Sequence, residues 1–326
     1  WMQKGHSINE SLVTSTVYDT SKFNCNGYGF VGPWRVQNSG GGTTSPESPL
    51  QGLIKSHNTT QASMASNIGL CAIADAAKEM GYHNAISNAS DIYSANSFQP
   101  PMTIGTVQAS PLTMANVYAT MGDNGVECTP IAITKVTDRS GSKVKVPSAN
   151  CHQAIDPDIA QTVSYALNQG VVQPGGEAST TQLDNNRKTF AKTGTNENTV
   201  MTTAGFVPNQ VAAFVAVADA QDPINNTFDN KTINGVYRPS WYGMYIATPA
   251  WKQFMNTYLA AINADRQRLR KGCRQVHGFE GCHQNIQPVP IPAPAEQSAA
   301  KPAAKPAADQ PRPAAAIAAT ACRAAK

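Results

Sequence analysis

The chain has 326 residues, of which 41% are hydrophobic, and this is enough apolar material for one large folded core or two small ones. Its formal net charge is +4, but residues 1–264 carry 15 Lys and Arg against 17 Asp and Glu, so the positive excess lies in residues 265–326. The expected folded body is therefore not basic, and no nucleic-acid partner is expected. The sequence contains no run of 18 apolar residues, so neither a membrane-spanning helix nor a signal peptide is expected within it.

The first residues, Trp1 to Gly5, are typical of the last turn of a helix that stops at a glycine. We therefore expect the chain to be part of a longer protein, with any export signal and membrane anchor upstream of Trp1.

Four expected helices begin with the same local signal, a capping residue followed by proline at the first helical position. Proline is tolerated there because the first N–H groups of a helix have no partner within it. A further helix is expected over 59–80, before Gly81. The capping pairs are Ser48-Pro49, Ser110-Pro111, Asp156-Pro157 and Thr248-Pro249, and the helices that they begin are expected over 49–55, 111–121, 157–168 and 249–269.

Three stretches rich in β-branched and apolar residues predict neighbouring strands of an antiparallel sheet. They cover residues 189–195, 202–207 and 211–217, and short polar turns separate them. A separate hairpin is expected over 131–146, around a turn at 138–141. Helices around a short antiparallel sheet indicate an α+β fold.

Seven cysteines leave one without a partner if all the others form disulfides. Cys128 and Cys151 flank the expected hairpin, and Cys273 and Cys282 are close in a polar loop, so two disulfides are expected from these pairs. Cys71 lies in an apolar helix, where a reduced thiol packed in the core is as good an interpretation as a disulfide. No Cys or His spacing resembles a zinc site, and we expect no metal and no cofactor.

Composition divides the chain into three parts. Residues 1–262 carry the expected helices and strands, residues 263–283 are a basic extension containing cysteines, and residues 284–326 are rich in proline and alanine. The last part has too few large apolar residues to fold, so we expect a disordered C-terminal tail.

The chemistry is concentrated in Lys192-Thr193-Gly194-Thr195, on the first strand of the sheet. This segment offers a cation, two hydroxyls and a backbone that a ligand can approach closely at Gly194. A second motif, Ser56-His57-Asn58, lies between two expected helices. The pattern S-x-N occurs also at Ser7, Ser94 and Ser148, but those matches lie in expected loops.

Together these segments resemble the penicillin-binding protein transpeptidase domain over about residues 1–262. The resemblance rests on five segments that occur in the order typical of the family. They are the Gly-rich segment 38–42, the S-x-N motif, the segment 109–115, the K-T-G-T strand and the start of the last helix at 242–252. It implies a serine β-lactamase/D,D-transpeptidase-like fold, an antiparallel sheet flanked by helices. The details, including the alanine/proline tail, are most similar to class A bifunctional enzymes of actinobacteria.

The resemblance also implies partners and a place of action. The partners would be peptidoglycan stem peptides ending in D-Ala-D-Ala, together with β-lactams, and a glycosyltransferase domain would lie upstream. The enzyme would cross-link stem peptides by acyl transfer at the outer face of the cytoplasmic membrane.

Roles in the site follow from the same resemblance. Ser56 would relay a proton between the base and the leaving amine, and Asn58 would bind the peptide amide of the substrate. Lys192 would supply a positive field in the cleft. Thr193, Gly194 and Thr195 would bind the substrate, through the two hydroxyls on its carboxylate and the backbone N–H of Thr195 as an oxyanion donor.

The nucleophile of this family is a serine followed three residues later by lysine. The pattern S-x-x-K occurs here at Ser140, Ser142 and Ser298, in the expected hairpin turn and in the tail, whereas a nucleophile with its base needs a helix in the core. We therefore expect a fragment that lacks its nucleophile and is inactive alone.

Two alternatives stay open. A β-lactamase or D,D-carboxypeptidase of the same fold would need a carboxylate that activates water, for which Glu177 is the candidate in its Gly-rich loop. A non-catalytic cell-wall-binding module is the other. His57 occupies the variable position of its motif, and we expect its side chain to point away from the reaction.

Overall fold

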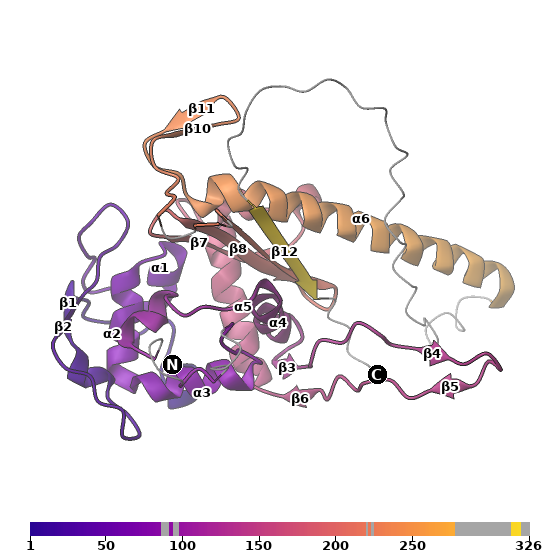
Figure 1. Ribbon diagram of the computed structural model, residues 1–326, viewed down its shortest axis with the longest axis horizontal. Helices are drawn as coiled ribbons and strands as arrows, with labels where there is room; N and C mark the ends of the chain where they lie inside the picture. The colour runs from indigo at the N-terminus through magenta and orange to yellow at the C-terminus, as the bar shows by residue number, and fades with distance from the viewer. Residues whose placement is uncertain (86–90, 94–97, 220, 223–224, 278–313, 321–326) are drawn as a thin grey trace. The chain divides into compact units, whose positions relative to one another are not determined.

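The computed structural model describes residues 1–85, 91–93, 98–219, 221–222, 225–277 and 314–320 (Figure 1). The chain divides into two units, one of residues 1–256 with 313–326 and one of residues 257–312. Among the described residues no helix is long and apolar enough to cross a bilayer.

An antiparallel sheet of four strands forms the centre of the first unit. The strands stand in the order β12-β9-β8-β7, so the K-T-G-T strand β7 (Phe190–Asn196) is at one edge. β8 (Val200–Val207) pairs with β7 so that Lys192 lies opposite Ala204, and β9 (Val211–Ala218) follows. The three strands predicted from the sequence are thus confirmed.

The fourth strand comes from the stretch predicted to be disordered. β12 (Ala314–Thr320) pairs with β9 over its whole length, with Ile317 opposite Val215. The expectation of a tail without structure is therefore wrong for these seven residues, although not tested for 278–313 and 321–326, which lie outside the described residues. The stretch contains no proline, and the edge of β9, which exists only in the folded sheet, supplies its hydrogen-bond partners.

Helices cover both faces of the sheet, and glycines allow them to approach it. On one face Trp251 of α6 (Gly243–His277) is fully buried, and a Cβ at Gly205 would lie 2.7 Å from its ring. On the other face Phe190 and Phe206 stack with their ring centroids 5.0 Å apart, against residues of α4 (Pro111–Gly122) and α5 (Pro157–Val172).

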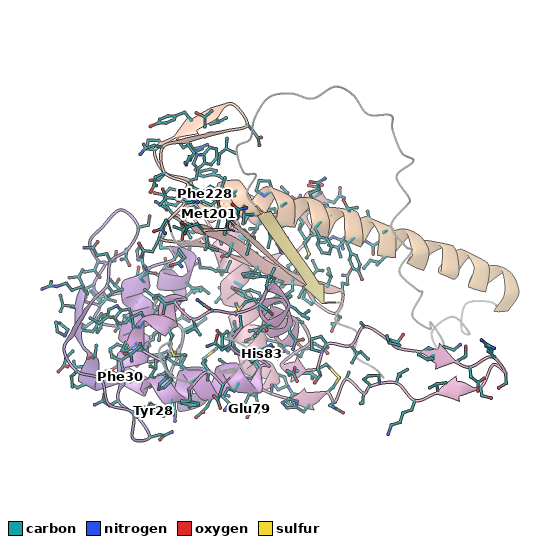
Figure 2. The ribbon with its side chains drawn as sticks, viewed as in Figure 1. Tyr28, Phe30, Glu79, His83, Met201 and Phe228 are labelled. Carbon is teal, nitrogen blue, oxygen red and sulfur yellow. A yellow bond between two sulfur atoms is a disulfide. The ribbon has the colours of Figure 1, made fainter. Side chains whose placement is uncertain are left out.

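A helical lobe with an aromatic core adjoins the sheet. It comprises α1 (Pro49–Ile54), α2 (Asn58–Ile68) and α3 (Leu70–Glu79), together with the ribbon of β1 (Val17–Asp19) and β2 (Pro33–Arg35). Figure 2 shows Tyr28 and Phe30 in this lobe, and both pack on Phe98, with ring centroids 4.7 and 5.9 Å away.

Two expected helix boundaries are wrong. The helix predicted over 59–80 is divided at Gly69, whose φ of 78° a helix cannot contain. The last helix begins at Gly243 rather than at Pro249, which lies inside it. Thr248 does not cap a helix, because its hydroxyl bonds to that of Thr203 on β8 instead.

Two disulfides join segments that are distant in sequence. Cys128–Cys151 confirms a predicted pair and closes a long arm, which carries the ribbon of β4 (Val136–Thr137) and β5 (Lys143–Val144). Cys25–Cys71 was not predicted and fixes the loop 24–28 on α3. The pair Cys273–Cys282 stays untested, because neither side chain is described.

The remaining elements are short. They are η1 (Met2–Lys4), η2 (Thr20–Phe23), η4 (Pro100–Ile104), β3 (Val126–Glu127), β6 (His152–Gln153), η5 (Ser179–Thr181), η6 (Asp184–Asn186), β10 (Lys231–Ile233) and β11 (Val236–Arg238).

Gly52 on α1 tests how closely the first two helices must pack. A Cβ added there would lie 2.5 Å from the Cβ of Thr60, which is completely buried on α2. We expect Gly52→Ala to lower the free energy of unfolding by about 1–3 kcal/mol, the usual cost of overpacking, as measured by urea titration. Gly29→Ala is the control, because a Cβ there meets nothing within 4 Å. If Gly52→Ala has the same free energy of unfolding as the wild type, α1 and α2 can move apart without loss of stability, and the prediction is wrong.

Candidate active site

The corner between α1 and α2 holds the S-x-N motif. α1 ends at Ile54 and is followed by the capping residue Lys55. Ser56 then adopts a left-handed conformation with φ 56°, which is uncommon for a residue with a side chain. The N–H of His57 returns to the carbonyl of Gly52 at 2.8 Å, and α2 starts at Asn58. The tight reversal brings the Ser56 side chain out of the helix and toward the sheet.

The structure brings Ser56 and Lys192 together although 136 positions separate them in the sequence. The Nζ of Lys192 donates to the Oγ of Ser56 at 2.6 Å and to the carbonyl of Thr193 at 2.9 Å. The edge of the sheet and the corner between the two helices therefore meet at the contact between Lys192 and Ser56.

The ammonium of Lys192 is poorly solvated in this position. Burial lowers its pKa from 10.5 to about 8, while the negative charge of Glu177 acts in the opposite direction. A lysine with a pKa near 8 can gain and lose a proton close to neutral pH, which an exposed lysine cannot do.

The other predicted site residues lie around this pair, and each has a partner within the protein. The amide Nδ2 of Asn58 donates to the carbonyl of Gln37 at 2.8 Å, and the hydroxyl of Thr193 donates to the carbonyl of Glu177 at 3.2 Å. The hydroxyl of Thr195 accepts from the N–H of Gly243 at 3.0 Å.

Gly194 is needed for close packing as well as for access. A Cβ at Gly194 would lie 2.3 Å from the hydroxyl oxygen of Thr202 on β8. A Cβ at Gly243 would lie 2.3 Å from the Gly194 carbonyl oxygen. The start of α6 therefore rests directly on the K-T-G-T strand, and neither position can carry a side chain without displacement.

The loop 173–178 forms a third wall of the site. The N–H of Glu177 donates to the carbonyl of Ile54 at the end of α1, and its carbonyl accepts from Thr193 on β7. The Glu177 backbone thus connects the helix corner to the sheet edge. Gly176 makes this possible, because a Cβ there would lie 2.3 Å from the carbonyl oxygen of Gly170.

One feature of the site was missed by the sequence analysis. The Nδ1 of His57 lies 2.9 and 3.0 Å from the two carboxylate oxygens of Glu47, and the hydroxyl of Thr60 also donates to Glu47. The side chain of Glu47 is only 5% exposed. Glu47 lies in a coil ten residues before His57, and no pattern in that coil predicts a buried acid.

The S-x-x-K matches at Ser140 and Ser142 lie outside this site. Both serines are exposed in the turn of the β4–β5 ribbon, where they bond to Asp138. Ser298 lies outside the described residues. Within the described part of the chain, no group of His, Cys, Asp and Glu is suited to hold a metal ion.

Comparison with known proteins agrees with this geometry. The family model of the penicillin binding protein transpeptidase domain matches residues 8–252. Penicillin-binding protein 1A of Neisseria meningitidis is 26% identical over 282 residues, which is 83% of this chain and 32% of that protein. The corresponding protein of Clostridium acetobutylicum is 27% identical over 173 residues, 53% of this chain and 20% of that protein. The chain thus spans about a third or less of the length of the curated relatives that it matches.

Among solved structures, the penicillin-binding protein PonA1 from Mycobacterium tuberculosis superposes with a TM-score of 0.63 at 21% identity, covering 79% of this chain and 65% of that one. The same protein in complex with penicillin V gives a TM-score of 0.61 at 20% identity, covering 78% and 64%. These likenesses confirm the predicted fold, and the family model covers most of the chain. The chain belongs to the penicillin-binding protein transpeptidase family.

Proposed function

We propose that the cleft between Ser56 and Lys192 is part of a D,D-transpeptidase site, which transfers the acyl group of a peptide ending in D-Ala-D-Ala to an amine of a second stem peptide. The observation that carries the proposal is the 2.6 Å contact between the Lys192 ammonium and the Ser56 hydroxyl. A hydroxyl that both donates and accepts, in contact with a lysine that titrates near neutral pH, is suited to relay a proton.

In the first step a serine oxygen attacks the carbonyl carbon of the penultimate D-Ala. An ester bond forms, the C–N bond breaks, and the leaving amine of the terminal D-Ala takes up a proton. Ser56 would deliver that proton and recover one from Lys192, whose ammonium donates to its hydroxyl. In the second step the amine of the second stem peptide attacks the ester carbonyl carbon. An amide bond forms, the ester C–O bond breaks, the amine loses a proton through the same route, and the leaving serine oxygen takes up a proton.

The anionic end of the substrate would bind along the edge of β7. A carboxylate there is attracted by Lys192 and can accept from the hydroxyls of Thr193 and Thr195. The N–H of Thr195 would donate to the oxyanion that forms during attack, a contribution of about 3 kcal/mol to lowering the barrier where it has been measured. β7 is the outer strand of the sheet, which leaves its free edge to the substrate.

The nucleophile is a separate part of the proposal. No S-x-x-K match of this chain lies in the described cleft, so we propose that the attacking serine and its lysine come from outside residues 1–326. As in class A bifunctional enzymes, an upstream glycosyltransferase domain and a membrane anchor would place the site at the outer face of the cytoplasmic membrane. The curated relatives are about three times as long as the matched part, which leaves room for such domains.

A hydrolytic enzyme of the same fold is the second candidate. It is favoured by one observation, the charge of Glu177 acting on Lys192 at the edge of the cleft. The two candidates differ in the lifetime of the acyl-enzyme: a transpeptidase keeps the penicilloyl ester for a long time, whereas a β-lactamase releases it within its catalytic cycle.

Labelling by a fluorescent penicillin tests the assignment. Residues 1–326 alone should give no covalent band on a denaturing gel, because the nucleophile is missing. The complete protein, with the upstream serine, should be labelled, and Ser56→Ala in that protein should slow labelling by about 100-fold or more, since the proton relay is lost. A covalent band on residues 1–326, or wild-type labelling of Ser56→Ala, would contradict the proposal.

The lowered pKa of Lys192 predicts a dependence of stability on pH. The unfolded chain has the ordinary lysine pKa of 10.5 and the folded one about 8, so between these values the unfolded state binds more protons. The free energy of unfolding should therefore gain a positive contribution from Lys192 as the pH rises from about 8 to 10.5. Below pH 8 the penalty of burying the charge is fully present and constant.

Denaturant titrations at pH 7.5 and 9.5, on the wild type and on Lys192→Met, measure this contribution by difference. The variant keeps the length and packing of the side chain without its charge, so tyrosines and other groups cancel in the comparison. Equal pH dependence in the two proteins would mean that the Lys192 pKa is not lowered.

A further inference from the structure

The contact between Glu47 and His57 lies next to Ser56, but the proposed reaction assigns no role to either residue. A carboxylate with 5% of its side chain exposed is costly to bury unless it is hydrogen-bonded. Glu47 receives two hydrogen bonds, from the ring of His57 and from the hydroxyl of Thr60. Such charge-assisted bonds are stronger than bonds between neutral groups, so the contact can hold a side chain in place.

Glu47 itself is fixed on the opposite side. Its N–H donates to the carbonyl of Leu12 at 2.9 Å, and its carbonyl accepts from the N–H of Leu12 at 3.0 Å, an isolated antiparallel bridge. The backbone that carries the Glu47 carboxylate is therefore held by the segment of Leu12, and His57 is hydrogen-bonded to that carboxylate.

Ser56 needs such support because its conformation is strained. A left-handed φ of 56° at a residue with a side chain costs of order 1 kcal/mol and persists only where the neighbours enforce it. Each residue of the motif is held by a different partner: Ser56 by Lys192, His57 by Glu47 and Asn58 by the carbonyl of Gln37.

We propose that Glu47 and His57 are positioning residues, which hold the Ser56 hydroxyl at the distance from Lys192 that proton transfer requires. The inference rests on the proposed function of Ser56. Glu47 and His57 line an open hollow of about 470 Å³, shared with Lys55 and Gln51, and neither Ser56 nor Lys192 lines it. The pair thus acts on the reaction only through the backbone of the corner.

The hydrogen bond to Glu47 determines which tautomer a neutral His57 adopts. Because the carboxylate accepts, a neutral His57 must carry its proton on Nδ1. In residues 1–326, two-bond ¹H–¹⁵N correlation spectra of the imidazole should show this tautomer in the wild type. The Nε2–H form at His57 would overturn the inference.

The functional test is the acylation of the complete protein by a fluorescent penicillin, separated into the dissociation constant of the initial complex and the acylation rate constant. His57→Leu should lower the rate constant about tenfold or more, because a displaced relay group loses its alignment, and should leave the dissociation constant within about twofold. His57→Gln should recover most of the rate, since its amide N–H can still donate to Glu47.

His6→Leu is the matched control. The Nδ1 of His6 makes the same kind of contact, 3.0 Å from the carboxylate of Glu10, but the two side chains are 33% and 41% exposed and neither belongs to the S-x-N motif. Its loss should leave the acylation rate unchanged. Melting temperatures of all variants separate a local effect from unfolding, because a purely structural role of His57 would lower the melting temperature without changing the rate of the protein that remains folded.

The outcomes distinguish the two proposals. If Ser56→Ala acylates as fast as the wild type, the proposed function fails and the positioning role fails with it. If Ser56→Ala is slow but His57→Leu acylates at the wild-type rate, only the positioning role is overturned. If His57→Gln is as slow as His57→Leu, the hydrogen bond to Glu47 is not the cause, and the inference is overturned as well.

Discussion

The contact between Lys192 and Ser56 joins the two halves of the molecule that carry the site. One partner lies on the outer strand of the sheet and the other on a corner of the helical lobe, so the 2.6 Å hydrogen bond connects the sheet directly to the lobe. It also explains why the lysine is unusual. The same packing that brings Ser56 close removes water from the ammonium, and the pKa falls to about 8. The position of the Lys192 side chain and its lowered pKa therefore have the same physical cause, its burial against Ser56.

Close approach at glycines sets the walls of this cleft. Gly52 lets α2 reach α1, Gly176 lets the loop of Glu177 turn back on α5, and Gly194 and Gly243 bring the start of α6 onto β7. At each of these positions a Cβ would lie 2.3–2.5 Å from the nearest other atom, so the spacing of the elements depends on the absence of a side chain. Close backbone contacts at these glycines thus set the spacing of the elements around the site.

The sequence predicts the elements of this fold well where local chemistry decides them. Ser48, Ser110 and Asp156 cap the helices that were expected, because the capping signal is contained in a few neighbouring residues. The division of the second helix at Gly69 was missed, since an isolated glycine is tolerated in many helices. The strand at 314–320 was missed because its partner edge exists only in the folded sheet.

The candidate site shows the same limit. Roles at one site were predicted for Lys192 and Ser56 because two separate motifs occurred in the order of a known family, and the structure places these two side chains in contact. The contact of Glu47 with His57 has no such signature. It depends on a bridge between Glu47 and Leu12, which joins two coil segments 35 residues apart, and pairing of this kind follows from the tertiary fold rather than from local pattern.

The present hydrogen bonds of Thr193 and Thr195 bear on the substrate binding proposed for them. A hydroxyl can donate once and still accept, so its present bonds decide what it can offer. Thr195 accepts from the N–H of Gly243 and keeps its own hydrogen for a carboxylate. Thr193 gives its hydrogen to the carbonyl of Glu177 and must turn away from it before it can donate to a substrate. The two threonines are therefore not equivalent in the proposed binding of a carboxylate: Thr195 could donate without losing a bond, whereas Thr193 would first have to give up its bond to the carbonyl of Glu177.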